Sequence, residues 1–135
     1  MELLVVIAII GFIGSIIFVQ LQQSRARSRD AEREQEIKSL QNALSLYVVN
    51  RKSHPVWPQN PTTFQALTCS AGDQIFSLLI AENTLPSSIC DPQNVSPYIY
   101  EYRTNDATGF SYELRYSLET NSISGKAPGQ HIATP

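Results

Sequence analysis

Apolar side chains fill the first part of the chain almost without interruption. Between residues 3 and 19 the run is broken only by Gly11, Gly14 and Ser15, and it contains no charged side chain. As a helix with a rise of ~1.5 Å per residue, this run covers about 26 Å, close to the ~30 Å hydrocarbon thickness of a bilayer. The pattern predicts that residues 1–21 form a membrane-spanning half of a helix.

An apolar segment at this position has two alternative interpretations. A secretory signal peptide starts with a basic region and ends at a small-residue cleavage site, and the following sequence QLQQSRARSRD offers no clear one. A helix buried in a protein core is the second alternative. A domain of 135 residues is small for covering a helix that is apolar on every side, so the membrane span is preferred.

The hydrophobic period changes further along the chain, where a single apolar stripe replaces the continuous run. Between Asp30 and Asn50 there is no Gly or Pro, and apolar residues recur at steps of three and four. The stripe consists of Ile37, Leu40, Leu44, Tyr47 and Val48. Glu34 and Lys38 are predicted on the outer face, in the order that favours an ion pair. Residues 22–52 are therefore predicted to continue the helix as an amphipathic half, which ends before the prolines of SHPVWPQNP.

The remaining residues, 53–135, are predicted to form a compact head that covers the apolar stripe, which gives an α+β fold. SAGDQIFSLLIAEN has a capping-box pattern, with Ser70 as the N-cap and Asp73 three residues later, and predicts a short helix. SPYIYEYR and FSYELRYSL alternate apolar and polar residues around the turn sequence TNDATG, which predicts an antiparallel hairpin. Its apolar face comprises Tyr98, Tyr100, Tyr102, Phe110, Tyr112, Leu114, Tyr116 and Leu118. Residues after Asn121 are predicted to be mostly tail, with room for a short edge strand.

Composition and motifs give little indication of chemistry. The net charge of −2 at pH 7 provides no general attraction for nucleic acid. His54 and His131 have no metal ligands at suitable spacing, and the sequence contains no P-loop, GxSxG, HExxH or GxGxxG motif. The loops TNDATG and LETNSISG offer fewer carboxylates than a calcium site usually needs, and Asp91 in ICDPQN is expected to shape a turn. We therefore expect a protein that is not an enzyme and that holds no cofactor or metal.

Taken together, these segments resemble the type IV pilin superfamily. The resemblance rests on ELLVVIAIIG, the charged helical continuation, LQNALSLY, the proline-bearing loop and the tyrosine-rich hairpin, and it is most specific over residues 2–21. Within the superfamily the chain is most similar to small pilins and to the major pseudopilins of type II secretion. The resemblance implies the type IV pilin fold, a long N-terminal helix packed against a small antiparallel sheet. It also implies a role as a structural subunit of a filament.

The resemblance assigns the apolar half to the membrane and, after assembly, to the core of the filament. The residues assigned to this surface are Leu3, Leu4, Val5, Val6, Ile7, Ile9, Ile10, Phe12, Ile13, Ile16, Ile17 and Phe18. Glu2 matches a glutamate of the family that is thought to meet the N-terminal amine of a neighbouring subunit, since a lone carboxylate in hydrocarbon needs a partner. Glu2 is accordingly expected to be an assembly contact. The other interpretation places Glu2 in the headgroup region with no such role.

The orientation in the membrane is predicted from two conflicting features. Arg25, Arg27, Arg29 and Arg33 follow the span, and the positive-inside rule alone would place the head in the cytoplasm. The family has the opposite orientation, directed by a basic leader, with the head outside the inner membrane and later in a periplasmic or extracellular filament. We expect the upstream DNA to encode such a leader, ending in Gly.

Cysteine usage favours the family orientation. Cys69 and Cys90 are the two cysteines of the chain, and a bond between them would close a 22-residue loop around the predicted short helix. In a small domain outside the cytoplasm such a pair is most simply a disulfide. Two separate buried thiols are the alternative.

The resemblance also implies the partners. They are other copies of the chain and related pilins in a helical filament, the inner-membrane assembly platform, the prepilin peptidase acting on the unprocessed form, and the lipid bilayer before assembly. A minor pilin that binds DNA or surfaces is the alternative function, since RARSR can pair with phosphates and the tyrosines can stack on bases. RARSR adjoins the span, where anionic headgroups or acidic neighbouring subunits are better placed, so nucleic acid is not expected as a partner.

Overall fold

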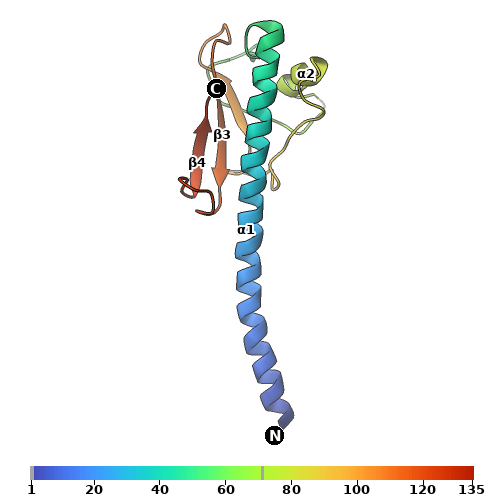
Figure 1. Cartoon of the computed structure of the whole chain (residues 1–135), viewed down its shortest axis with the longest axis vertical. Helices are drawn as coiled ribbons and strands as arrows, with labels where there is room; N and C mark the ends of the chain where they lie inside the picture. Colours follow the sequence, from blue (N-terminus) through green and yellow to red (C-terminus); the bar gives the residue numbers. More distant parts are fainter. Residues whose placement is uncertain (1, 71) are drawn as a thin grey trace.

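One long helix forms the axis of the molecule, and a small sheet packs against its second half (Figure 1). The computed structural model describes residues 2–70 and 72–135, apart from the side chains of Glu2 and Ile16. The helix, α1 (Glu2–Arg51), contains 50 residues and is therefore about 75 Å long. Its N-terminal half extends away from the head as a bare helix. The fold is α+β, with the arrangement predicted from the sequence.

The long helix continues from its apolar half into its amphipathic half without a break. Its sequence contains no Gly or Pro after Gly14, so no residue interrupts the hydrogen-bond ladder before the end. The helix ends at Arg51, before the prolines as predicted and one residue short of the predicted boundary at residue 52. There Lys52 adopts a left-handed conformation with a φ of 64° and donates its N–H to the carbonyl of Val48 at 2.7 Å.

Four antiparallel strands form one sheet in the order β1-β2-β3-β4. The strands β2 (Glu101–Thr104) and β3 (Tyr112–Leu118) form the predicted hairpin. The strand β4 (Gly129–Ala133) pairs with β3 as an edge strand, in the part of the chain predicted to be mostly tail. The strand β1 (Gln65–Ala66), which the sequence pattern did not predict, pairs with β2 at the other edge.

The core of the head lies between the apolar stripe of α1 and the inner face of the sheet. Ile37, Leu40 and Leu44 are each no more than 2 % exposed, Tyr47 is buried, and Val48 is half-buried. The sheet contributes buried side chains that alternate along the strands as predicted, namely Tyr102, Tyr112, Leu114, Tyr116 and Leu118, and Tyr100, directly before β2, is buried with them. The predicted stripe is therefore the surface on which the head is built.

Two residues predicted on the apolar face of the hairpin lie elsewhere. Phe110 is 85 % exposed, because β3 begins at Tyr112 and Phe110 belongs to the preceding turn, where the Asp106 carboxylate accepts its N–H at 3.3 Å. Tyr98 precedes β2 and is half-buried. Its ring lies against Arg33, with the guanidinium carbon 4.5 Å from the ring centroid.

The short helix α2 (Gln74–Ala81) begins later than predicted. Its N-cap is Asp73 and not Ser70, because one carboxylate oxygen of Asp73 accepts the N–H of Phe76 at 3.1 Å. The other oxygen accepts the N–H of Thr68 at 2.7 Å, so the same side chain also holds the segment before the helix. The buried side chains of the helix are Ile75, Phe76 and Leu79.

The predicted disulfide is present. Cys69 and Cys90 are separated by 21 positions in the sequence and are bonded, with their Cα atoms 5.8 Å apart. The bridge encloses α2, and Cys90 is followed directly by Asp91, which is buried. The disulfide thus fixes the point at which the chain, coming back from α2, reaches the long helix.

Replacing both cysteines by serine should lower the free energy of unfolding of the head by about 3 kcal/mol, the loop-entropy value for a ring of this size. The loss is measured by chemical denaturation of the full chain in detergent, followed by near-ultraviolet circular dichroism. Reductant should cause a similar loss in the wild type and none in the Cys69→Ser/Cys90→Ser variant. Equal stability of the variant and the oxidised wild type would contradict the expectation.

Candidate functional site

The N-terminal half of α1 is an apolar cylinder in contact with nothing else in the described chain. Every described large apolar side chain from Leu3 to Leu21 is exposed, from 45 % at Leu21 to 77 % at Leu3. The helix is long and apolar enough to cross a membrane, and none of its most apolar window is buried. Water is a poor solvent for such a surface, whereas a bilayer is a suitable one.

The residues predicted to line the membrane and filament-core surface can be compared with the structure only in their exposure. All of those whose side chains are described are exposed: Leu3, Leu4, Val5, Val6, Ile7, Ile9, Ile10, Phe12, Ile13, Ile17 and Phe18. Because they occupy consecutive turns, they surround the helix on all sides. The side chains of Glu2 and Ile16, which belong to the same predictions, lie outside the described part, so the assembly contact of Glu2 stays a prediction.

The apolar surface has uneven relief. Ala8 lies between larger neighbours and leaves a shallow hollow lined by Leu4, Val5, Ala8, Ile9 and Phe12. A Cβ atom added at Gly11 or Gly14 would meet nothing within 4 Å. A side chain of a neighbouring helix can pack into such a hollow.

A buried ionic cluster joins α1 to the head just beyond this surface. It consists of Arg29, Asp30, Arg33, Asp91 and Glu119. The Arg33 side chain is fully buried, and it donates to Asp91 from Nε at 2.6 Å and from Nη2 at 3.1 Å. Its Nη1 donates to Asp30 at 3.0 Å and to Glu119 at 2.6 Å. One guanidinium on the helix therefore binds both the loop after the disulfide and the end of β3.

Asp30 and Arg29 complete the attachment of the end of β3. The Asp30 carboxylate accepts the N–H groups of Glu119 and Thr120 at 2.9 and 2.8 Å. Arg29 donates to both carboxylate oxygens of Glu119, at 2.8 and 2.6 Å. These contacts are bidentate and charge-assisted, the geometry in which hydrogen bonds are strongest.

The contacts of the cluster favour the charged forms of Arg33 and Glu119. Burial by itself lowers the pKa of Arg33, but its hydrogen bonds to Asp91 and Glu119 outweigh burial and raise the pKa above its usual value. The hydrogen bond from Arg29 is the main reason why the pKa of Glu119 is lowered. The ion pair between Arg33 and Glu119 is therefore intact at neutral pH.

A second polar contact corrects a prediction from the sequence. Glu34 does not point to the outer face of α1 as predicted, because its carboxylate turns to the head and accepts from Lys126 Nζ with both oxygens at 2.7 Å. The Tyr116 hydroxyl donates to it at 3.1 Å. Burial acts to raise the pKa of Glu34, but the Lys126 ammonium outweighs burial and lowers it.

The ionic cluster was not predicted from the sequence. Asp91 does shape a turn as expected, accepting the N–H of Gln93 at 2.8 Å, but it also binds Arg33. The available signal was the i,i+3 spacing of Asp30 and Arg33, which puts opposite charges on one helix face. Nothing in the local sequence indicated that two carboxylates from the head would meet them.

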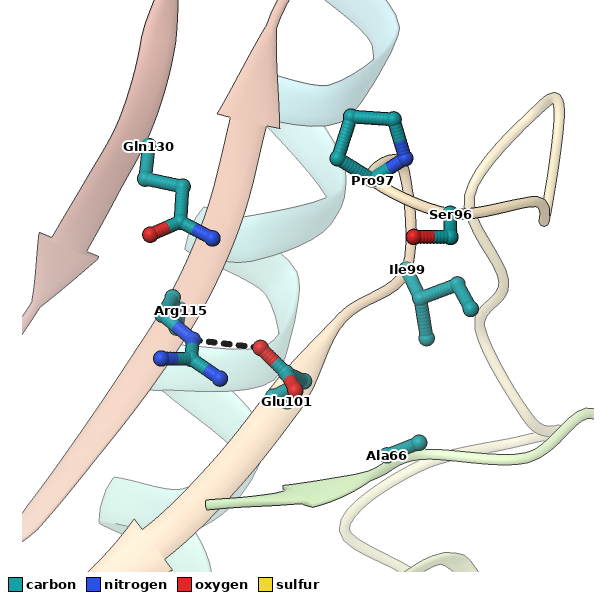
Figure 2. A pocket seen from close by; sticks show the side chains of 7 residues that line it. All are labelled: Ala66, Ser96, Pro97, Ile99, Glu101, Arg115 and Gln130. Atoms are coloured by element: carbon teal, nitrogen blue, oxygen red, sulfur yellow. Dashed lines mark hydrogen bonds and ion pairs between the residues drawn. The ribbon is translucent and has the colours of Figure 1, made fainter.

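The outer face of the sheet carries a small hollow of about 140 Å³, which points away from α1 (Figure 2). It is lined by Ala66, Ser96, Pro97, Ile99, Glu101, Arg115 and Gln130. Glu101 and Arg115 form an ion pair across β2 and β3, and Arg115 also lies over the Phe64 ring, with 4.2 Å between its guanidinium carbon and the ring centroid. The carboxylate of the hollow is thus paired, and the lining residues include no imidazole or thiol to act as a nucleophile or base.

No metal site is found among the described residues. Within 2–70 and 72–135, no group of three or more His, Cys, Asp or Glu could hold a metal ion. The tyrosines invoked for base stacking, Tyr100, Tyr102, Tyr112 and Tyr116, are buried in the core of the head. These four tyrosines are therefore not available for stacking on bases.

Comparisons with family models, curated proteins and solved structures found no match for this chain. The architecture itself is compatible with a pilin-like fold, because a long apolar N-terminal helix packs onto a small antiparallel sheet and a disulfide closes the head. The exposed apolar half of α1 is therefore the candidate functional surface.

Proposed function

We propose that this chain is a structural subunit of a type IV pilus-family filament, either a pilin or a type II secretion pseudopilin. The observation that carries the proposal is the apolar cylinder from Leu3 to Leu21, exposed on all sides and continuous with the helix that bears the head. Such a surface suits two successive environments, the bilayer before assembly and a bundle of identical helices afterwards.

The energetics allow the chain to move between these environments. Covering one Leu, Ile or Phe side chain is worth about 1.5–3 kcal/mol relative to water, so the cylinder does not remain in water. Lipid tails and neighbouring helices are almost equally apolar, so transfer from the membrane to a filament is decided by packing and polar contacts. Uneven relief around Ala8, Gly11 and Gly14 is what such packing requires.

The proposal includes the location and the partners expected from the resemblance. The Cys69–Cys90 disulfide supports a head that folds outside the cytoplasm. The apolar half would anchor the subunit in the inner membrane, where the prepilin peptidase processes it and the assembly platform moves it into a filament with other copies. This role needs no catalytic residue, cofactor or metal.

The test introduces bulk into the cylinder where the isolated subunit has room for it. The Gly11→Leu/Gly14→Leu variant should fold and enter the membrane as the wild type does, because nothing lies within 4 Å of either added Cβ. Filaments, sheared from cells that contain the cognate assembly system and quantified by immunoblot, should fall at least about tenfold, since misfit packing of about 1.4 kcal/mol already gives that factor.

The control is Val49→Leu, which adds bulk at a residue that is 78 % exposed on the same helix but outside the cylinder. It should leave the yield of filaments unchanged. Wild-type yields for the double glycine variant would show that the cylinder is only an anchor. A wild-type chain that stays in the membrane and forms no filament would refute the proposal itself.

A further inference from the structure

We infer that Arg25 and Arg27 form a binding site for the headgroups of acidic phospholipids. The inference rests on the membrane step of the proposed function and adds to it the class of lipid that the subunit selects. Its basis is the pairing of the basic residues after the apolar cylinder, their position along α1 and their directions around it.

The first observation is that only two of the four arginines are free to bind a ligand. Arg29 is paired with Glu119, and Arg33 is paired with Asp91 and two further carboxylates. Arg25 and Arg27 are exposed and make no hydrogen bond or ion pair with any residue that the structure describes. The head thus neutralises the two arginines nearest to it and leaves the two nearest to the cylinder.

The second observation is the place of these two arginines along the helix. Arg25 lies four residues beyond Leu21 and Arg27 lies six beyond it, or about 6 and 9 Å along the axis. The headgroup layer on each side of the ~30 Å hydrocarbon core is about 5–8 Å deep, and arginine stems reach back toward it. Both guanidinium groups can therefore reach lipid phosphates when the cylinder spans the membrane.

The third observation is that the two arginines point in opposite directions. Residues two apart on a helix are separated by about 200° around its axis, so Arg25 and Arg27 lie on opposite faces. A single protein surface docked on one side could contact only one of them. Lipid headgroups surround a membrane helix on every side, and they can contact both.

The chemistry of the pair favours an acidic headgroup over a zwitterionic one. A guanidinium binds phosphate through two parallel hydrogen bonds. No acidic side chain lies between Leu3 and Arg29, so the two free charges are not compensated within this stretch. A zwitterionic headgroup brings its own cation, whereas an acidic headgroup has a net charge to neutralise, and one arginine near an acidic surface favours binding about fivefold.

The inference is tested with the full chain in phosphatidylcholine vesicles that contain a trace of spin-labelled lipid. Electron spin resonance resolves the motionally restricted lipids in contact with the protein. We expect spin-labelled phosphatidylglycerol to be enriched several-fold there relative to spin-labelled phosphatidylcholine. The enrichment should fall to about one in the Arg25→Gln/Arg27→Gln variant, and about 1 M salt, with a Debye length near 3 Å, should weaken it in the wild type.

Single variants and a control make the test specific. Arg25→Gln and Arg27→Gln should each remove part of the enrichment, and a preference carried wholly by one of them would overturn the two-sided site. Lys38→Gln removes an exposed charge that lies far from the membrane on the same helix, and it should leave the enrichment unchanged.

The remaining outcomes distinguish this inference from the proposed function. If the wild type immobilises both labelled lipids equally, the lipid site is overturned. The same holds if the enrichment survives in the double variant. In both cases the membrane step of the proposed function is unaffected. Self-association that the double variant abolishes, without any lipid preference, would assign the arginines to a second copy and overturn the site as well. A wild type that restricts no lipid at all would refute the membrane step.

Discussion

Replacing Arg33 by methionine should lower the free energy of unfolding of the head by about 3–5 kcal/mol, the range seen when one partner of a buried ion pair is removed. The methionine fills much of the space but leaves three carboxylates, Asp30, Asp91 and Glu119, without their shared cation. Denaturant titration of the full chain in detergent, followed by circular dichroism, measures the loss. The expected loss is a large fraction of the about 5–15 kcal/mol by which an ordinary domain is stable.

Arg51→Met is the matched control. Arg51 is also an arginine of α1 paired with a carboxylate of the head, Glu82, but its side chain is 60 % exposed. Removal of such an exposed pair costs about 0–1 kcal/mol. If the two variants lose the same stability, burial does not determine the strength of these contacts and the ionic cluster is not the main polar attachment of the head.

Glu2→Gln should cause the second large effect, on assembly and not on folding. If Glu2 neutralises the N-terminal amine of a neighbouring subunit in the filament core, the amide keeps its size but leaves the amine buried and unpaired. The penalty for a broken buried pair is about 3–5 kcal/mol. Insertion into the membrane should be unharmed, because an amide is less costly to bury than a carboxylate. We expect normal subunit levels in the membrane fraction and few or no sheared filaments.

Glu32→Gln makes the same chemical change at an exposed carboxylate of α1 and should leave the yield of filaments unchanged. This control removes any general effect of altering the net charge of the subunit. Should Glu2→Gln assemble as well as the wild type, Glu2 lies in the headgroup region and takes no part in assembly.

Features encoded by local patterns were predicted correctly from the sequence. The long helix, its end at Arg51 and the hairpin follow from hydrophobic period and from where Pro and Gly stand, because these determine backbone conformation over a few residues. The disulfide followed from cysteine count and compartment. The exposed apolar surface could be predicted because an almost continuous apolar run of this length has few possible environments.

Features that depend on distant residues were missed or misplaced. The pairing of Glu34 with Lys126 joins residues 92 positions apart, and the local Glu34–Lys38 spacing indicated a different partner. Ser70 and Asp73 both satisfy the rules for an N-cap, and the choice between them depends on the contact of Asp73 with Thr68. The two-residue strand β1 has no detectable period of its own, because it exists through its pairing with β2.

The unbroken course of α1 makes the subunit a rod with the head attached along the side of its C-terminal half (Figure 1). No Gly or Pro occurs between Ser15 and Arg51, so a pull along the axis passes from the apolar end to the head without a hinge. The force enters the head sideways, through the Arg33 cluster, the Glu34–Lys126 pair and the apolar stripe, which lie along the rod and are loaded in shear. Contacts arranged in parallel share such a load, and the head therefore resists sliding along the helix better than any one of its contacts would alone.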